Sequence, residues 1–559
     1  MDIKKEIISY VSNEQIKDKL LELISETQDK SKGDYSIPCF SLAKEMHMSP
    51  MLIAENIKNT YKTNNLIEKI EVINGYLNFF LNKKEFNKLV IENSKNSDFY
   101  ASKEFENKVL CLDYSSVNLA KYMHIGHLST TIIGESLARI YENFGYKAVR
   151  INYIGDYGTP FGKMIYAYLN WGNEKELNEK GVDYLQDLYV EFYRKSEKDK
   201  SLEEKAREYF KLIEEKDAKI YPIYQKFIEI SKKEAKNLLD TLGVKFDSWK
   251  GESAYTEKLS SVVKMLEEKN LLKESEGAKV VDLEPYNLGV CLIVKSDGTS
   301  LYATRDIAAA IDRFNEYNFD KLIYVTAVQQ KLHFEQFFKV LELMGYSFSK
   351  NLQHVYYGMF SLSTGKIASR LGKQAVLKDL MAFAENKVLD IVKDRVFTIE
   401  NKQEVAKKIA MSALKFNAIK NEKIKDSVFD LETCFSFDGD TSAYMQYSYA
   451  RICSILRKVG NLDEKIDYNY LNSDESFNLL FHIYNFKNTV KKAMELNEPS
   501  VISKYTLELC KLVNKFYIAE KVITDNKAET NAKANLLNLA KKIIGKAFNL
   551  ICLDTIEEM

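Results

Sequence analysis

The stretch from residue 108 to residue 158 constrains the fold most, because it contains two apolar strands separated by one helix. Residues 108–116 (KVLCLDYSS) and 148–158 (AVRINYIGDYG) are apolar segments of strand length. Between them, residues 130–145 (TTIIGESLARIYENFG) place apolar side chains on one face with helical spacing. Neighbouring strands that are joined through a helix run parallel in one sheet. The sequence therefore predicts a parallel α/β sheet, whose ligands bind at the carboxyl ends of the strands.

The same pattern returns further along the chain, where polar clusters again follow apolar strands. The predicted elements are a strand and hairpin around Asp297–Gly298 (290–304), a buried strand (321–328), a helix (329–345), a strand (354–360) and a polar loop (361–373). Because the ends of parallel strands meet at one edge of a sheet, we expect these clusters to converge there.

The sequence outside the sheet predicts further domains. Residues 1–105 predict a small α+β domain with a hairpin at Asn74–Gly75. The parallel-sheet domain is predicted at 106–394 and includes a Lys/Glu-rich helical insertion at about 165–255. Residues 395–559 contain only helical patterns. The predicted fold class is therefore multidomain α/β, with a small α+β domain at the N-terminus and an all-α domain at the C-terminus.

Charge and cysteine content exclude several classes of protein. Lys+Arg and Asp+Glu both number 80, so the chain is not a general polyanion binder coated in positive charge. Seven scattered cysteines without a C-x-x-C argue against a disulfide framework or a zinc cluster, so we expect a cytoplasmic protein without a bound metal. No signal peptide and no apolar run approaching roughly 18 residues is present, so we expect no membrane association.

The turn before the helix at 130–145 carries distinctive chemistry. His124 and His127, two of only six histidines, flank Gly126 in NLAKYMHIGHLST, and Lys121 precedes them. A helix N-terminus offers free N–H groups to an anion, and imidazoles and Lys121 are hydrogen-bond donors. The alternatives are two incidental histidines or a metal pair, although metal-binding histidines prefer an i, i+4 spacing and a third ligand. We interpret this turn as a candidate site for a nucleoside triphosphate.

Six ordered segments extend this signature over most of the chain. Together they resemble the class I aminoacyl-tRNA synthetases, whose signature is His-Ile-Gly-His after the first strand of a Rossmann-like fold, and the arginyl-tRNA synthetases in particular. The segments are DYSSVNLAKYMHIGHLSTTIIGESL, YIGDYGTPFG, FDSWKGESAY, LYATRDIAAAIDRF, YVTAVQQKLHFEQFF and FSFDGDTSAYMQYSYARICSI.

The resemblance implies two-step chemistry. The carboxylate of L-arginine attacks the α-phosphorus of ATP, bound as Mg-ATP, and arginyl-adenylate and pyrophosphate form. The 2′-hydroxyl of the terminal adenosine of the tRNA for arginine then attacks the adenylate. The resemblance also implies that the N-terminal domain contacts tRNA, that the helical C-terminal domain binds the anticodon, and that the protein is a monomer.

For the nucleotide site, the resemblance assigns ATP binding to His124, Gly126 and His127, with both histidines catalytic. The first transition state gathers negative charge on phosphoryl oxygens, so fixed donors are the useful catalytic groups. No covalent nucleophile from the protein is required. We therefore expect these residues to act through hydrogen bonds to phosphate.

The second class I signature, Lys-Met-Ser-Lys-Ser, matches the loop at 361–373. Lys366 fits its first lysine as a catalytic and ATP-binding residue, while Ser369 stands at the second lysine and Arg370 follows. The resemblance implies that a lysine before the histidine signature compensates for such a degenerate loop, which adds Lys121 to the catalytic set. Without the resemblance, this loop would be interpreted as a solvated basic turn.

For the amino acid, the resemblance places Asp113 and Asp306 on the guanidinium, Tyr302 in the pocket, and Asn118 and Gln330 on the α-amino group. Bidentate carboxylates suit a planar guanidinium with five donors. The first acidic position is usually Glu in the family. From the residues alone, Asp306 is also a candidate helix N-cap and Tyr302 a packing residue. Asp113 is harder to dismiss, since an unpaired carboxylate beside an apolar strand is costly.

In the C-terminal domain, Tyr444, Tyr447 and Arg451 share one helical face, and Gln446 lies on a neighbouring face. Tyrosines that stack on unpaired bases are typical of RNA recognition, so these four residues are predicted to bind tRNA. The alternative is that the tyrosines belong to the core, as tyrosines at helical spacing more often do.

Three positions depart from the family pattern. Tyr122 replaces a proline, Ser129 replaces an arginine and Pro160 replaces a glutamine. Two other functions are consistent with parts of the sequence. A different acid-activating nucleotidyl transferase would lack the paired carboxylates. A non-catalytic tRNA-binding paralogue would be expected to lose the histidines, Lys121 or Asp306, all of which are present.

Overall fold

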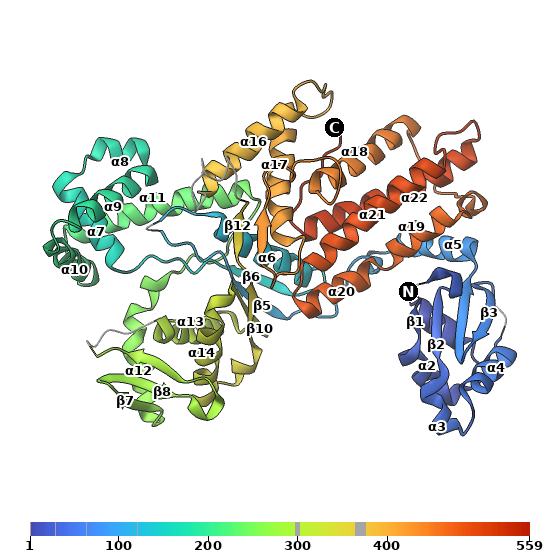
Figure 1. The fold of residues 1–559 in the computed structure, drawn as a ribbon, viewed down its shortest axis with the longest axis horizontal. Helices are drawn as coiled ribbons and strands as arrows, with labels where there is room; N and C mark the ends of the chain where they lie inside the picture. The colour runs from blue at the N-terminus through green and yellow to red at the C-terminus, as the bar shows by residue number, and fades with distance from the viewer. Residues whose placement is uncertain (1, 28, 63, 120, 297–301, 364–375) are drawn as a thin grey trace. The chain divides into compact units, whose positions relative to one another are not determined.

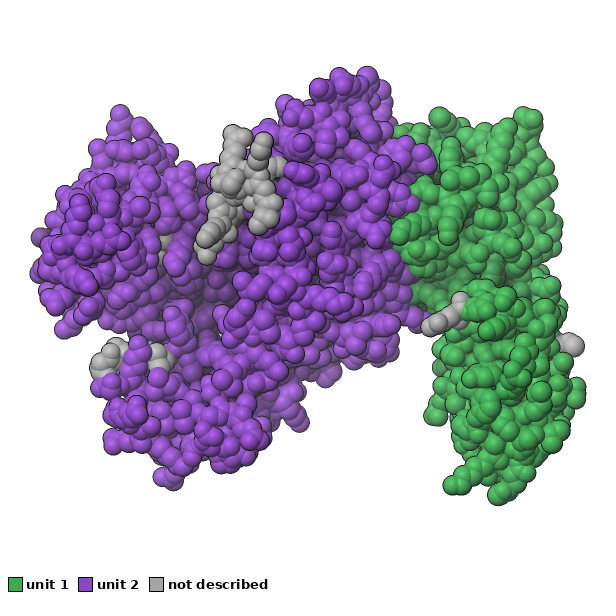
Figure 2. Space-filling view, in the orientation of Figure 1, with its two compact units in different colours: residues 1–101, 452–487, 508–544 green, residues 102–451, 488–507, 545–559 purple. Residues whose placement is uncertain are grey.

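The computed structural model describes the chain except residues 1, 28, 63, 120, 297–301 and 364–375 (Figure 1). The chain forms two compact units, coloured separately in Figure 2. Unit 1 comprises residues 1–101, 452–487 and 508–544, and unit 2 comprises residues 102–451, 488–507 and 545–559. The helices after residue 451 therefore contribute to both units.

Unit 2 is built on a four-stranded parallel sheet with the order β11-β10-β5-β6. Its strands are β5 (Val109–Asp113), β6 (Lys147–Ile151), β10 (Lys321–Ala327) and β11 (Leu352–Tyr357). In register, Asp113 at the end of β5 faces Tyr324 of β10 and Ile151 of β6. The parallel α/β sheet predicted from residues 108–158 is confirmed.

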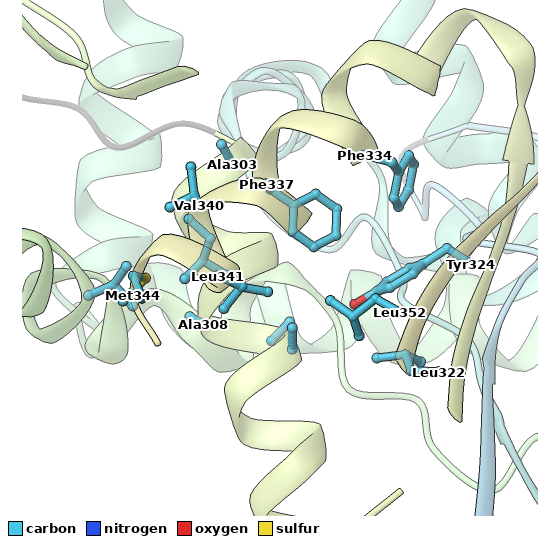
Figure 3. Close-up of a cluster of buried hydrophobic side chains, with 14 of the residues drawn as sticks. Ala303, Ala308, Leu322, Tyr324, Phe334, Phe337, Val340, Leu341, Met344 and Leu352 are labelled. Carbon is cyan, nitrogen blue, oxygen red and sulfur yellow. The ribbon is translucent and has the colours of Figure 1, made fainter. Parts of the chain in front are cut away.

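Two crossover helices connect these strands. Helix α6 (Ile125–Glu142) joins β5 to β6, and α14 (Lys331–Leu343) joins β10 to β11. Gly134 lets α6 approach the strand, because a Cβ at this position would lie 2.2 Å from the Tyr114 ring. On α14, Phe334 and Phe337 pack with Tyr324 of β10 in the buried cluster of Figure 3.

A small antiparallel sheet and two helices lie between β6 and β10 in sequence. They are β7 (Leu272–Ser275), β8 (Ala278–Asp282), β9 (Val290–Val294), α12 (Leu259–Glu268) and α13 (Tyr302–Tyr317). The hairpin predicted around Asp297–Gly298 lies outside the described residues. The first described residue after that gap, Tyr302, already begins α13, which packs on α14 and β9.

The predicted helical insertion consists of five amphipathic helices in the described part of the chain. They are α7 (Thr159–Trp171), α8 (Glu174–Lys180), α9 (Val182–Ser196), α10 (Ser201–Glu214) and α11 (Ile220–Thr241). Their apolar faces pack together, with α7 contacting both α9 and α10. The rest of unit 2 contains a parallel pair of short strands, β12 (Phe360–Leu362) and β13 (Ser427–Phe429), with α16 (Leu377–Val392) and α17 (Lys402–Ile419).

Unit 1 contains the predicted α+β region. Its antiparallel sheet has the order β1-β2-β4-β3, and its elements are α1 (Ile3–Ser9), α2 (Lys17–Leu23), β1 (Ser25–Glu26), β2 (Tyr35–Pro38), α3 (Ala43–Met46), α4 (Pro50–Thr60), β3 (Ile67–Ile73), β4 (Tyr76–Leu81) and α5 (Lys83–Asn93). The predicted hairpin turn is confirmed, since Asn74 and Gly75 have φ angles of 50° and 80°. On α5, Phe86 packs against Phe477 and Phe481 of α19.

The C-terminal part of the chain is helical after residue 441, but the expectation of helices alone over 395–559 is wrong, because β13 lies in that range and pairs with β12. Its helices are α18 (Ser442–Val459), α19 (Asp474–Tyr484), α20 (Phe486–Leu496), α21 (Ser500–Ala519) and α22 (Lys527–Leu550). Within the described ranges, no helix has the length and apolar character needed to cross a lipid bilayer.

Candidate active site

The chain after β5 makes a strained turn at the edge of the sheet formed by the carboxyl ends of the strands. Ser115 and Ser116 have φ angles of 70° and 48°, a left-handed conformation that costs a residue with a side chain roughly 1–2 kcal/mol. The Ser115 N–H donates to Thr130 Oγ1 of α6 at 3.2 Å. The turn then runs beside residues 154–155, where the Leu119 N–H donates to the Gly155 carbonyl at 3.1 Å. This route brings the chain to the start of α6.

The histidine turn, residues 121–127, begins α6 with a capping box made of imidazoles. His124 Nδ1 accepts the Gly126 N–H at 3.1 Å, and His127 Nδ1 accepts the His124 N–H at 3.0 Å. Because both Nδ1 atoms act as acceptors, the proton of each neutral ring lies on Nε2. Each histidine therefore presents an Nε2–H donor on the side away from the backbone.

These bonds correct one expectation about the anion site. The N–H groups of Gly126 and His127 were expected to be free, but they already donate to His124 Nδ1 and to the His124 carbonyl at 2.8 Å. The capping box satisfies these groups as cap side chains usually do. These two backbone groups are therefore not free to bind an anion.

The histidines of this turn are neutral. Burial lowers the pKa of His127 to about 3, with a smaller contribution from His124. Burial and then the charge of Lys121 lower the pKa of His124. Because protonation would remove the Nδ1 acceptors, the capping box also favours the neutral rings. The positive charge of the histidine turn therefore comes from exposed Lys121.

The first described residues after the signature loop, Val376 and Leu377, contact the histidine turn. Lys366, Ser369 and Arg370 lie outside the described residues. Immediately after the gap, Val376 forms an antiparallel bridge with His124, and the Leu377 N–H donates to the Met123 carbonyl at 2.8 Å. The chain that leaves the loop is thus hydrogen-bonded to the histidine turn.

The three positions that depart from the family pattern have different surroundings. The Tyr122 hydroxyl donates to Asp183 Oδ1 of the helical insertion at 3.0 Å. Ser129 is buried in α6. Pro160 is the second residue of α7, where a proline costs no helical hydrogen bond.

Asp113 has a partner within the chain that the sequence analysis missed. Its carboxylate lies 2.8 Å from the guanidinium of Arg313, and both side chains are at most 5% exposed. The Arg313 guanidinium also lies over the rings of Tyr153 and Tyr324, at 5.2 and 5.5 Å. Burial raises the pKa of Asp113, and Arg313 opposes this shift. The arginine-binding role of Asp113 stays a prediction. In that role, Asp113 would act while paired with Arg313.

Asp306 lies inside α13, four residues after its first described residue, Tyr302. The alternative that Asp306 caps the helix N-terminus is therefore wrong. Its Oδ2 lies 2.5 Å from His333 Nε2 of α14. This contact links α13 to α14. An arginine seven residues after Asp306 on an otherwise alanine-rich helix was the sequence signal that could have revealed Arg313.

A third acidic residue, Glu252, belongs to the same region and was not assigned a role from the sequence. Burial raises the pKa of Glu252 to about 7, Arg305 opposes the shift, and Asp306 and Asp156 add to it. The charge of Asp306 also raises the pKa of Asp113. We call Asp113, Glu252 and Asp306 the carboxylate cluster. Glu252 lies in the quoted segment FDSWKGESAY, which was the available signal.

The other predicted amino-acid contacts lie at the ends of strands or helices. Asn118 is exposed after β5, Gln330 is exposed after β10 in the short helix Val328–Gln330, and Tyr302 is 65% exposed. Gly155 packs against Asn118, since a Cβ at Gly155 would lie 3.3 Å from the Asn118 Cα. Their exposure at this edge is compatible with ligand contact.

The predicted tRNA-binding helix requires one correction. Gln446 of α18 is fully buried, and its Nε2 donates to Ser412 Oγ at 3.1 Å and to the Asp554 carbonyl at 2.8 Å. The side chain therefore stabilises packing in unit 2 and is not available to RNA. The helical period placed Gln446 on a face next to that of the two tyrosines, but it could not show which face of the helix is buried.

Tyr444, Tyr447 and Arg451 are partly exposed in unit 2. Arg451 donates to the Tyr447 hydroxyl at 3.1 Å, and the Tyr447 ring lies 6.4 Å from Phe437. The guanidinium of Arg395 lies over the Phe437 ring, 4.8 Å from its centroid. This alternation of guanidinium and aromatic groups resembles a platform for unpaired bases, and sequence analysis missed Arg395 and Phe437.

Three family descriptions match this chain and cover nearly all of it. Residues 89–431 match "tRNA synthetases class I (R), catalytic domain", residues 445–559 match "DALR anticodon binding domain", and residues 1–81 match "Arginyl tRNA synthetase N terminal domain".

Curated relatives and solved structures agree with these matches. An arginine–tRNA ligase of Clostridium beijerinckii is 41% identical over 566 residues and covers all of both chains. That of Clostridium perfringens is 42% identical and covers 94% of both chains. Among solved structures, the Thermus thermophilus arginyl-tRNA synthetase matches with a TM-score of 0.83 at 21% identity, over all of both chains. The Plasmodium falciparum enzyme matches with a TM-score of 0.79 at 24% identity, over 100% of this chain and 99% of that one.

Proposed function

Because the chain belongs to the arginyl-tRNA synthetase family and is an arginine–tRNA ligase, we propose that its activation site extends from the histidine turn to the carboxylate cluster. ATP, L-arginine and tRNA are the substrates of this activity. Magnesium enters as Mg-ATP, and the enzyme acts as a cytoplasmic monomer. Arginyl-adenylate forms first, and its arginine is then transferred to the 2′-hydroxyl of the terminal adenosine.

At the nucleotide end, His124 and His127 donate from Nε2 to phosphoryl oxygens as charge develops. Their rings are held by the capping box, so they need no reorganisation in the transition state. Lys121 supplies positive charge at the same turn, and Lys366, Ser369 and Arg370 of the signature loop add ATP contacts. Gly126 leaves room for the nucleotide beside the histidine backbone.

At the amino-acid end, Asp306 binds the guanidinium of the substrate. The single observation that carries this assignment is the difference in partners within the carboxylate cluster. Asp113 and Glu252 each have an arginine of the chain beside them, at 2.8 and 3.8 Å, whereas the partner of Asp306 is a histidine. Asp113 contributes through its pair with Arg313. Tyr302 closes the pocket, and Asn118 and Gln330 bind the α-amino group.

For the tRNA, Tyr444, Tyr447 and Arg451 contact unpaired anticodon bases. The support is their partial exposure and the adjoining Phe437 and Arg395. Gln446 does not contact the tRNA, because it is buried.

ATP–pyrophosphate exchange, measured with each amino acid in turn and with or without tRNA, tests the proposed function. We expect exchange with arginine only, and only when the tRNA for arginine is present, because the degenerate signature loop fits a site that needs tRNA for its assembly. Robust exchange with arginine and ATP alone would remove the tRNA dependence. Exchange with another amino acid would contradict the assignment of Asp306 to a guanidinium.

A further inference from the structure

The three members of the carboxylate cluster have chemically different partners. Asp113 pairs with Arg313, and Glu252 lies 3.8 Å from Arg305. A guanidinium stays protonated at every physiological pH, so it compensates a carboxylate permanently. Asp306 instead contacts His333, whose Nε2 lies 2.5 Å from its Oδ2. An imidazole fixes a carboxylate by a hydrogen bond and, unlike a guanidinium, carries no permanent charge.

The surroundings hold the His333 ring in one orientation. His333 is the third residue of α14, and its ring lies 5.5 Å from the rings of both Phe334 and Phe337. Figure 3 shows these two phenylalanines in the buried cluster beside Tyr324. His333 and Asp306 are themselves 30% and 19% exposed, so a ligand can approach the pair. A rigid ring beside a partly accessible carboxylate suits a residue that orients a binding group.

We infer that His333 is a positioning residue for arginine specificity: its ring donates from Nε2 to Asp306 Oδ2 and thereby aims the carboxylate at the substrate guanidinium. This inference rests on the proposed function, in which Asp306 binds that group. A carboxylate held in one rotamer loses less conformational freedom on binding, so affinity for arginine increases.

Other groups near the pair determine which measurement isolates this effect. The titratable groups near Asp306 are Asp113, Tyr153, Glu252, Cys291 and Tyr324, and His354 lies near His333 and Lys331. Burial lowers the pKa of His354 to about 4 and raises that of Glu252 to about 7. Glu252 therefore titrates near neutrality, so the variants are compared at one fixed pH. The difference in the arginine KM between wild type and a His333 variant at that pH reports on His333.

The test compares two substitutions by steady-state exchange in the presence of tRNA. His333→Ala removes the donor, and we expect the arginine KM to rise about tenfold or more while the ATP KM and kcat change by less than about threefold, the scale of one hydrogen bond to a charged group. His333→Gln keeps a neutral Nε2 donor, so we expect its KM to return to within about threefold of wild type.

Gln336→Ala is the matched control on the same helix. Gln336 donates to the Leu288 and Val290 carbonyls, so its loss should lower the melting temperature without raising the arginine KM. Equal KM increases in the Ala, Gln and control variants would identify a purely structural role for His333 and overturn the inference.

The outcomes also separate this inference from the proposed function. If Asp306→Asn raises the arginine KM but His333→Ala does not, the positioning role fails and the guanidinium assignment stands. If Asp306→Asn also leaves the KM unchanged, the guanidinium assignment itself fails.

Discussion

The end of β5 and the second turn of α13 each present an aspartate that the family pattern places on the guanidinium, yet the two sites differ. Asp113 is buried against Arg313 at 2.8 Å, whereas Asp306 is partly exposed and contacts His333 at 2.5 Å. Removing one partner of a buried ion pair leaves an uncompensated charge, so Asp113 is needed for the stability of the fold. Asp306 keeps a charge that a ligand can use. The partner and the burial of a carboxylate thus separate its roles where the residue type does not.

The largest expected effect comes from Asp306→Asn. This change keeps the shape of the side chain but removes the charge, and loss of one side of a charge-assisted pair costs about 3–5 kcal/mol. We expect the arginine KM to rise by about two to three orders of magnitude, measured by exchange with tRNA present. Asp312→Asn is the matched control, because Asp312 lies on the same helix and pairs only with surface lysines 250 and 258 among the described residues. An unchanged KM in Asp306→Asn would remove the distinction between the two aspartates.

A comparable loss, but of stability, is expected from Asp113→Asn. The change leaves the buried guanidinium of Arg313 without its anion, at a cost of about 3–5 kcal/mol. Thermal melting should show a clear drop in Tm. Adding Arg313→Met removes the orphaned charge, so the double variant should recover part of the loss. A double variant that melts below the single one would contradict this account of the pair.

A smaller effect is expected at the histidine turn, where exposed Lys121 supplies the positive charge. Lys121 sits on a short turn next to neutral His124, so Lys121→Ala should lower the rate of adenylate formation about 100-fold, the scale of one preorganised donor. Lys366→Ala should raise the ATP KM more than it lowers the rate. Single-turnover adenylate formation with tRNA present measures both. A larger rate loss in Lys366→Ala would mean that the signature loop has kept its catalytic lysine.

The smallest effect concerns Glu252, whose arginine partner is more distant than that of Asp113. Burial raises its pKa to about 7 in the folded protein, above its ordinary value of 4.5. The folded state therefore binds the carboxyl proton of Glu252 more tightly than the unfolded state does. The stability contributed by protonated Glu252 is lost as the pH rises from about 4.5 through about 7. Glu252→Gln should remove this loss. We expect its Tm to match wild type at pH 5 and to exceed it at pH 8; an equal difference at both pH values would exclude the titration.

Local sequence predicted the elements that are encoded over a few residues. The apolar spacing of residues 108–158 predicted the strand, helix and strand, and Asn74–Gly75 predicted the hairpin turn. These features depend on periodicity and on the left-handed angles that asparagine and glycine tolerate. The ordered motifs identified the family and located the histidine turn. For these features, the chemistry of neighbouring residues was sufficient.

Only the tertiary structure decided the partner of each polar group. Arg313 is 200 positions from Asp113, and the two meet because the sheet places β10 and α13 beside the end of β5. Gln446 pairs with Ser412 and Asp554 for the same reason, so its helix face alone could not reveal that it is buried. Burial and long-range pairing depend on the order of strands and on helix packing, which no short window of sequence contains. The sequence thus determined the family and the local elements, and the packing determined which charges remain available to a ligand.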